Sequence, residues 1–310
     1  MPPLATVVTL IDFEVGTERA WSDLRRTLRG LARQDFQEPF EVILLEDENL
    51  SDRIPDDLTQ ILPSLRVELS PKSLQYDLKS EAARVGTSDL VILLDADCEP
   101  VPSWLRLLIE TMRRHPEVGV VSGKTKYAGR TFLERACGVL GRAYVDRTGA
   151  GEIKHISNNN AAFRREVLKN HPLPTRAGPF SSKLHAEAIM RDGWKLWVEP
   201  EAGVTHAFDG WSMEKDIRRH TGYAIVTVRQ LDPQLSHSWM VRFRYLSIPI
   251  IVTARVAESW IRVLRFFRTY GLRWYEVPLV LGLSIVLHLE EIPGMICAFQ
   301  GHPITETAYR

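Results

Sequence analysis

The chain has 310 residues, of which 45% are hydrophobic and 25% are charged, and its 39 basic side chains balance its 39 acidic ones. This length and apolar content can bury one large core, or one core with a small appendage, which excludes a disordered or fibrous protein. The zero net charge excludes a global positive field around the molecule. We therefore expect no nucleic-acid partner.

The three cysteines, Cys98, Cys137 and Cys297, show neither a metal-ligand spacing nor a disulfide framework. Their pattern suits a reducing compartment. The first residues, MPPLAT, place no basic stretch ahead of an apolar one. We therefore expect no cleaved signal peptide and a catalytic part that stays inside the cell.

Short apolar segments alternate with helix-like stretches along the first part of the chain. Runs without polar alternation predict buried parallel strands, and apolar residues at helical spacing predict helices between them. This alternation indicates a doubly wound, mostly parallel α/β sheet in a domain of residues 1–230. The predicted strands cover residues 6–11, 41–45, 90–94 and 118–121, and the predicted helices cover residues 20–34 and 102–114.

Ligands of such sheets bind beyond the carboxyl ends of the strands. The residues that follow three of the predicted strands are acidic, and they lie at 12–14, 46–48 and 95–99. The strongest signal is the segment VILLDADCEP at 91–100, in which an apolar strand ends in Asp95 and Asp97. Two carboxylates at this spacing can turn toward one cation, and hard oxygen ligands suit Mg²⁺ or Mn²⁺. Such a metal would neutralise a diphosphate leaving group.

Three segments give residues 7–208 a resemblance to the family-2 glycosyltransferases, which have the Rossmann-like GT-A fold. EVILLEDENLSD at 41–52 resembles the family's acidic, nucleoside-binding strand end, and YDLKSEAARVGTSDLVILLDAD at 76–97 resembles its lysine-bearing stretch before the metal site. SNNNAAFRREVL at 157–168 resembles the Asn-rich turn beside its acceptor pocket. The resemblance implies contacts with a nucleotide-sugar donor from Glu46, Asp47, Lys79, Asp95 and Asn159.

Two further segments extend this resemblance. GWKLWVEPEAGVTH at 193–206 is similar to the family's strand with a closing histidine, which implies that His206 binds the metal or the diphosphate. A lone histidine at a strand end is more often a satisfied surface group. Asp12 and Glu14 stand where the family has Ile-Pro-x-Tyr-Asn and are further candidates for donor contacts. Arg218 and Arg219 are candidates for a cover over the donor diphosphate, with a solvated amphipathic helix as the alternative.

The catalytic base is where the chain departs from the family pattern. The family has a Glu-Asp pair at the start of a helix, whereas PFSSKLHAEAIMRDG at 179–193 has none. Glu187 and His185 are the nearest proton acceptors, and they lie roughly 200° apart on a helix, so they cannot face the same pocket. We expect Glu187 to be the base, with His185 as the alternative. Asp192 is a less favoured candidate for the base, because it would lie at the helix end, open to solvent.

Residues 231–310 are predicted to form a C-terminal helical, membrane-associated segment. Seven arginines lie between 240 and 275 against one acid, Glu258, and four of them share an arc of about 140° on a helix, as in an interfacial helix. The apolar runs 246–254 and 277–287 are shorter than the roughly 20 residues that span a bilayer, and a longer second run would enclose Glu290 and Glu291. Two buried helices of a soluble subdomain are the alternative.

These features together predict a metal-dependent, inverting glycosyltransferase. It would move a sugar from a nucleoside-diphosphate sugar to a lipid or polysaccharide acceptor at the cytoplasmic face of a membrane, with Mg²⁺ or Mn²⁺ as the cofactor. The missing Glu-Asp pair supports an alternative, a glycosyltransferase-like protein that binds nucleotide without turnover. A nucleotidyltransferase would need a glycine-rich phosphate loop near the N-terminus, and DFEVG at 12–16 is not one.

Overall fold

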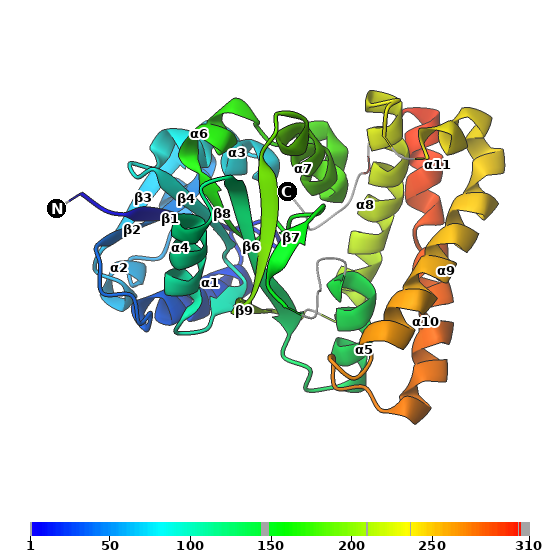
Figure 1. Ribbon diagram of the computed structural model, residues 1–310, viewed down its shortest axis with the longest axis horizontal. Helices are drawn as coiled ribbons and strands as arrows, with labels where there is room; N and C mark the ends of the chain where they lie inside the picture. Colours follow the sequence, from blue (N-terminus) through cyan, green and yellow to red (C-terminus); the bar gives the residue numbers. More distant parts are fainter. Residues whose placement is uncertain (1, 144–148, 209, 236, 303, 305–310) are drawn as a thin grey trace.

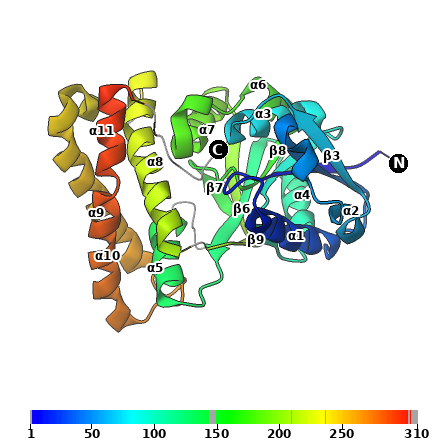
Figure 2. The same ribbon diagram turned by 180° about the vertical axis from the view of Figure 1, so that it is seen from behind.

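The computed structural model describes residues 2–143, 149–208, 210–235, 237–302 and 304. An α/β part that contains the sheet lies on one side of the molecule, and a group of long helices lies on the other (Figure 1). The view from behind shows the same division, with α8 between the α/β part and the outermost helices (Figure 2).

One sheet contains all nine described strands, in the order β3-β2-β1-β4-β8-β6-β9-β5, with β7 paired to β9. The first four strands in chain order are parallel neighbours, and β9 is parallel to β6, whereas β8 runs antiparallel between β4 and β6. The prediction of a mostly parallel sheet is therefore confirmed, and all four predicted strands are present. The strands are β1 Ala5–Leu10, β2 Phe40–Asp47, β3 Leu65–Ser70, β4 Leu90–Asp95, β5 Cys98–Pro100, β6 Val118–Tyr127, β7 Gly151–Ile153, β8 Asn160–Arg164 and β9 Lys195–His206.

Helices cover both faces of the sheet. Because side chains alternate along a strand, Val7 of β1 faces α1 and α4, whereas Val8 faces α3, α6 and α7. Each face therefore buries its own apolar core, which explains why these strands are apolar without alternation. The helices of this part are α1 Glu18–Ala32, α2 Leu58–Ile61, α3 Gln75–Val85, α4 Trp104–Arg114, α5 Phe132–Gly141, α6 Arg165–Asn170 and α7 Ser181–Arg191, with the 3₁₀ turns η1 Glu48–Arg53 and η3 Thr175–Phe180.

The C-terminal helices form the second part of the molecule. They are α8 Gly210–Leu231, η4 Ser238–Leu246, α9 Ser247–Phe266, η5 Trp274–Glu276, α10 Val277–Leu289 and α11 Ile292–Gln300. In Figure 1, α8 runs beside α11, α10 lies in line with α11, and α9 runs along their outer side. The boundary at 230/231 stays a prediction, but α8 packs with the helices that follow it, because Ile225 and Val226 share a core with Met295 and Phe299.

The contact between α8 and α11 depends on two glycines. A methyl group added at Gly222 would lie 1.9 Å from the main-chain oxygen of Glu291, and one added at Gly294 would lie 1.9 Å from that of Arg219. Only hydrogen side chains allow the two backbones to approach this closely. This approach sets the position of the polar side chains between the two helices.

We expect Gly222→Ala to destabilise the protein by about 2 kcal/mol or more, because the added methyl group forces the two helix backbones apart. Gly282→Ala in α10 is the matched control, since nothing lies within 4 Å of an added methyl group there. It should be neutral or stabilise the fold by up to about 1 kcal/mol. Thermal unfolding of the two variants measures the difference, and equal midpoints would contradict the close helix contact.

Candidate active site

Three aspartates meet at the carboxyl ends of β1 and β4. The two strands are paired in register up to Leu10 and Asp95, so Asp12, just past the end of β1, lies beside the end of β4. Carboxylate oxygens of Asp12, Asp95 and Asp97 all lie within 4.8 Å of one another. Sequence reasoning placed Asp12 at the donor, and the structure shows that it belongs equally to the group of possible metal ligands.

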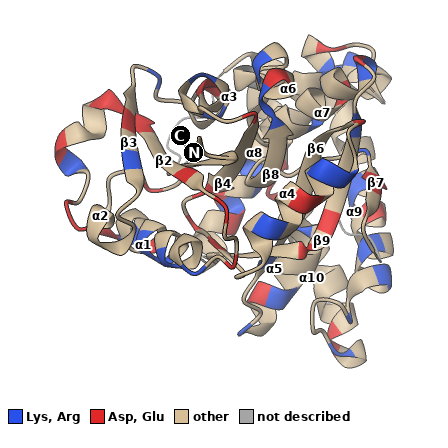
Figure 3. Ribbon diagram, turned by 60° about the vertical axis from the view of Figure 1, so that its left-hand side comes forward, with Lys and Arg blue, Asp and Glu red and all other residues tan. Residues whose placement is uncertain are grey.

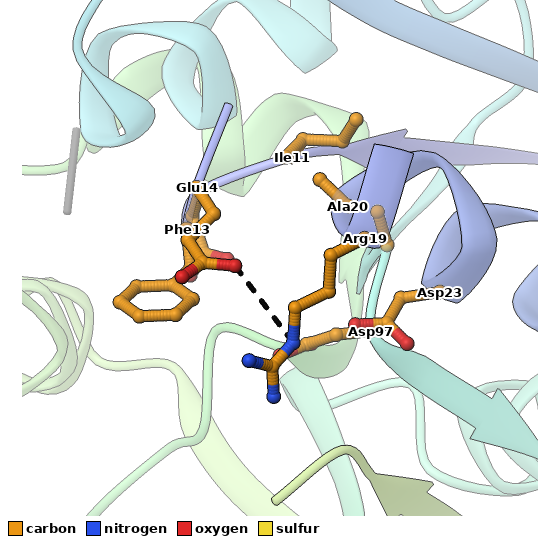
Figure 4. A pocket seen from close by; sticks show the side chains of 9 residues that line it. Ile11, Phe13, Glu14, Arg19, Ala20, Asp23 and Asp97 are labelled. Carbon is orange, nitrogen blue, oxygen red and sulfur yellow. Dashed lines mark ion pairs between the residues drawn. The ribbon is translucent and has the colours of Figure 1, made fainter. Parts of the chain in front are cut away.

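Ala96 explains why the two aspartates of the motif face the same way. Its main-chain nitrogen donates to the oxygen of Leu10 at 3.0 Å, and its oxygen accepts from the Thr27 hydroxyl at 2.7 Å. Ala96 is thereby held in the core under α1, and the side chains of Asp95 and Asp97 both lie close to Asp12. Asp97 lines a cleft with residues of the β1–α1 loop and α1, and Figure 4 shows Arg19 reaching toward Glu14 beside it.

Lys79 of α3 is the principal cation at this cluster. Its Nζ lies 2.7 Å from Oδ1 of Asp95, and both side chains are buried. Burial opposes the charged form of Lys79, but the charges of Asp95 and Asp12 outweigh it and raise the pKa of Lys79. The predicted lysine therefore lies at the aspartate motif, where it neutralises one carboxylate.

The remaining acids carry more negative charge than Lys79 can neutralise. Burial raises the pKa of Asp95 to about 7 despite the attraction of Lys79. Burial also raises the pKa of Asp97 well above its ordinary value, and the charges of Asp12 and Asp95 add to this rise. Buried carboxylates in this state gain stability from a nearby cation. The acid cluster therefore fits the divalent metal that the sequence predicts.

His206, the last residue of β9, completes the set of possible ligands. Its Nδ1 donates to the main-chain oxygen of Ala207 at 2.6 Å, so its Nε2 carries the lone pair, and Nε2 lies 3.2 Å from Oδ2 of Asp97. Burial lowers the pKa of His206 well below its ordinary value, and nearby Arg142 lowers it further. A neutral imidazole fixed by a carbonyl on its far side is a common arrangement for a metal ligand.

Cys98 lies close to Asp97 and His206, because it pairs with His206 across β5 and β9. Burial raises the pKa of the Cys98 thiol well above its ordinary value, and the charge of Asp97 raises it further. Since only the thiolate is a strong ligand, the available donors are carboxylate oxygens and an imidazole nitrogen. This set suits Mg²⁺ or Mn²⁺ better than a thiolate-binding metal.

The acids at the end of β2 have structural partners. The carboxylate of Glu46 is fully buried and accepts a hydrogen bond from the Ile11 nitrogen at 2.8 Å, which ties β2 to the loop after β1. Asp47 caps η1 by accepting from the Asn49 nitrogen at 2.9 Å. Glu14, in contrast, lines the cleft and pairs with Arg19 at 3.7 Å. Donor contacts from Glu46 and Asp47 stay a prediction.

The Asn-rich turn connects the site to α7. Oδ1 of Asn159 accepts from the hydroxyls of Ser157 and Thr125, and its main-chain oxygen accepts from the Asp95 nitrogen at 3.2 Å. Asn158 donates to the hydroxyl of Ser182 at 3.1 Å. Asn159 therefore fixes the turn against the aspartate motif, and its predicted contact with the donor remains a prediction.

The two candidate bases on α7 have different surroundings. His185 is buried in the core, stacked on Phe163 with ring centroids 5.5 Å apart, and burial lowers its pKa to about 4. This position disfavours the alternative role of His185, because the core encloses its imidazole; that role stays an untested prediction. Glu187 is half-buried and pairs with Arg191 at 3.4 Å. It also interacts electrostatically with Arg229 of α8.

The arginines of α8 also differ from each other. Arg218 is buried between carboxylates, with Nη2 3.7 Å from Glu214 and Nη1 3.5 Å from Glu291. These ion pairs disfavour its predicted place over the donor diphosphate, which stays an untested prediction. Arg219 is exposed on the same helix, and its predicted contact stays a prediction.

Residues 17–171, half of the chain, match the family model described as glycosyl transferase family 2. The chain belongs to this family. Glucosyl-dolichyl phosphate glucuronosyltransferase of Haloferax volcanii is 25% identical over 160 residues, which are 48% of this chain and 50% of that protein. Probable N-acetylgalactosaminyltransferase 9 of Caenorhabditis elegans is 28% identical over 100 residues, or 30% of this chain and 17% of that protein. The match therefore spans half or less of the length of these two relatives.

A solved structure shows the same fold over nearly the whole chain. The mannosyltransferase PcManGT from Pyrobaculum calidifontis, in complex with GDP-Man and Mn²⁺, superposes with a TM-score of 0.59 at 14% identity. The superposition covers 98% of this chain and 89% of that one. It confirms the predicted fold class, a GT-A sheet followed by C-terminal helices.

We expect Asp97→Asn to leave the fold intact and to remove metal-dependent binding of a nucleoside diphosphate, because a neutral amide is a weaker ligand for a hard cation. Titration calorimetry with Mn²⁺ and UDP or GDP measures the affinity. Asp35→Asn is the control, since Asp35 pairs with Arg106 on the exposed surface. Undiminished metal-dependent affinity in the Asp97 variant would remove this residue from the site.

Proposed function

We propose that the protein is a metal-dependent, inverting glycosyltransferase that moves a sugar from a nucleoside-diphosphate sugar to a lipid or polysaccharide acceptor. The observation that carries the proposal is the meeting of Asp12, Asp95 and Asp97 at the strand ends of a family-2 chain, with His206 next to Asp97. Relatives support it: the Haloferax volcanii protein is named for a glucosyl-dolichyl phosphate substrate, and the Pyrobaculum calidifontis structure contains GDP-Man and Mn²⁺.

In the proposed reaction, Asp95, Asp97 and His206 would hold Mg²⁺ or Mn²⁺. A bound divalent cation would neutralise the charge that develops on the departing nucleoside diphosphate. Lys79 favours the ionised form of Asp95, and the carbonyl of Ala207 keeps Nε2 of His206 available. Glu187 takes the proton of the acceptor hydroxyl, and a single displacement inverts the anomeric configuration.

The face of α7 that carries Glu187 suits an anionic acceptor. Lys183 lies one turn before Glu187, and burial lowers its pKa, with the positive charge of Arg229 adding to the effect. Burial likewise lowers the pKa of Arg229. Partly buried cations with lowered pKa values gain stability from an anion. We therefore favour an acceptor with a phosphate group close to the hydroxyl that receives the sugar.

A membrane is the proposed location of the acceptor. In the described residues, one helical stretch, Trp274–Gln300, has the length and composition to cross a bilayer, with 27 residues and a mean hydropathy of 1.6. Figure 3 shows that α10, within this stretch, carries no Lys, Arg, Asp or Glu.

Exposed hydrophobic side chains support a membrane location more strongly than the apolar helical stretch does. The large hydrophobic side chains that are exposed gather after residue 230, and Leu246, Ile261 and Trp274 are 78%, 69% and 77% exposed. Arg265 and Arg268 lie beside aromatic rings of the same segment. An apolar surface edged by arginines suits an interface with anionic lipids. We place it on the cytoplasmic face, where three free cysteines would stay reduced.

The function is tested by turnover of nucleotide sugars with Mn²⁺ and a membrane lipid extract. We expect Glu187→Gln to preserve donor affinity and to lower turnover by roughly two to four powers of ten, because the amide cannot accept the proton. Asp192→Asn at the end of the same helix should cost little, since Asp192 contacts His171 at the surface. Equal rates for the two variants would exclude Glu187 as the base, and absence of turnover in the unaltered protein would favour the non-catalytic alternative.

Membrane binding is tested with surface variants, because a deletion of residues 240–310 would also remove the partners of α8. We expect Ile261→Ser with Leu264→Ser to weaken binding to phosphatidylglycerol vesicles by about tenfold or more, since both side chains are exposed on α9. Leu69→Ser on β3 is the control, because this side chain is exposed on the opposite part of the molecule. Vesicle cosedimentation measures the effect, and unchanged binding would make α9 an ordinary surface helix.

A further inference from the structure

His206 is held in place by Tyr127 as well as by its own backbone. The two residues are paired across β6 and β9. Their rings are perpendicular, with an interplanar angle of 88° and centroids 5.6 Å apart. The hydrogen bond from Nδ1 to Ala207 fixes one edge of the imidazole, and the tyrosine ring restricts its tilt.

The hydroxyl of Tyr127 is itself anchored on both sides. It donates to Oε1 of Glu214 at 3.0 Å and accepts from Nη2 of Arg142 at 3.3 Å. The guanidinium of Arg142 also lies 5.1 Å from the centre of the tyrosine ring. Because Tyr127 and Glu214 are buried, this hydrogen bond is shielded from competition by water.

Glu214 begins a series of buried charges that continues to the C-terminal helices. Arg218, one turn later on α8, pairs with Glu214 at 3.7 Å and with Glu291 at 3.5 Å. Glu291, at the junction of α10 and α11, also accepts from Arg255 of α9 at 2.6 and 2.9 Å and contacts His288 at 2.9 Å. A buried carboxylate needs such partners, so the helices must pack in one arrangement to satisfy it.

We propose that Tyr127 and Glu214 are positioning residues that fix His206 as a metal ligand, and that the C-terminal helices contribute to this site through Arg218 and Glu291. The inference rests on the proposed function for the metal and extends it to residues outside the ligand set. Gly222 and Gly294 set the distance between α8 and α11, and therefore the place where Arg218 meets Glu291. The helices thus support the active site in addition to carrying the exposed apolar surface.

Variants of a positioning residue should change metal affinity, whereas variants of a purely structural residue should change stability alone. A structural hydrogen bond lost from the core lowers stability and leaves the metal affinity of the folded protein unchanged. A positioning residue changes the orientation of His206, so it changes metal affinity in the folded protein. Outer-shell partners of metal ligands typically alter affinity by about 10- to 100-fold.

The test uses Tyr127→Phe and Glu214→Gln in the full-length protein. Tyr127→Phe keeps the ring beside His206 and removes only the hydroxyl, and Glu214→Gln keeps the shape and removes the charge. We expect both to weaken Mn²⁺ binding by about tenfold in calorimetry with UDP or GDP present. In the metal-free protein, both should also shift the imidazole resonances of His206 in NMR spectra.

Ser259→Ala is the matched control, because the Ser259 hydroxyl lies 2.8 Å from Nε2 of His288 at the far end of the same series. It should lower the melting temperature to a similar extent and leave Mn²⁺ affinity within about twofold of the unaltered protein. An equal loss of Mn²⁺ affinity in all three variants would mean general destabilisation and would overturn the inference.

Two reference variants, His206→Ala and Asp97→Asn, distinguish a failure of this inference from a failure of the proposed function. If Tyr127→Phe and Glu214→Gln bind Mn²⁺ normally while His206→Ala does not, the positioning role is wrong and the metal site stands. If His206→Ala binds normally while Asp97→Asn does not, His206 is not a ligand and the inference is likewise wrong. If both reference variants bind Mn²⁺ normally, the metal proposal itself fails.

Discussion

Mutual repulsion of closely spaced carboxylates is the constraint around which the α/β part is organised. Asp12, Asp95 and Asp97 are brought together because β1 and β4 are neighbours in register and because Ala96 is held in the core between the two aspartates. Lys79 reaches them from α3 and neutralises part of the charge. The remaining negative charge makes the folded protein a better receptor for a cation than the unfolded chain, so metal binding would also stabilise the fold.

A second group of buried charges organises the helical part. Glu291 lies among Arg218, Arg255 and His288, on three different helices. Since an unpaired buried carboxylate is costly, these partners fix how α8, α9 and α10 meet. Tyr127 lies between this group and the acid cluster. Its ring packs perpendicular to the ring of His206, and its hydroxyl donates a hydrogen bond to Glu214. The two parts of the molecule are therefore joined by polar contacts as well as by apolar packing.

The start of α7 is where this chain differs from the pattern expected of its family. Ser181 and Ser182 occupy the helix start, and their hydroxyls bond to the Pro174 oxygen and to Asn158. These bonds join the helix to the Asn-rich turn beside the aspartates. Glu187 lies more than one turn further on, on a face turned to the C-terminal helices. The proposed base therefore comes from the side on which a membrane-bound acceptor would arrive.

The sequence by itself determined the strands β1, β2, β4 and β6, the helices α1 and α4, and Asp95 and Asp97 as a pair, because these depend on local apolar patterns and on spacing along the chain. Only the tertiary structure decided which residues join them. Asp12 became part of the acid cluster through strand pairing, and Tyr127 came to His206 in the same way. Periodicity shows which residues share a helix face but not which element covers that face. His185 is therefore enclosed against Phe163, and Arg218 meets Glu291 far along the chain, through packing that no local pattern encodes.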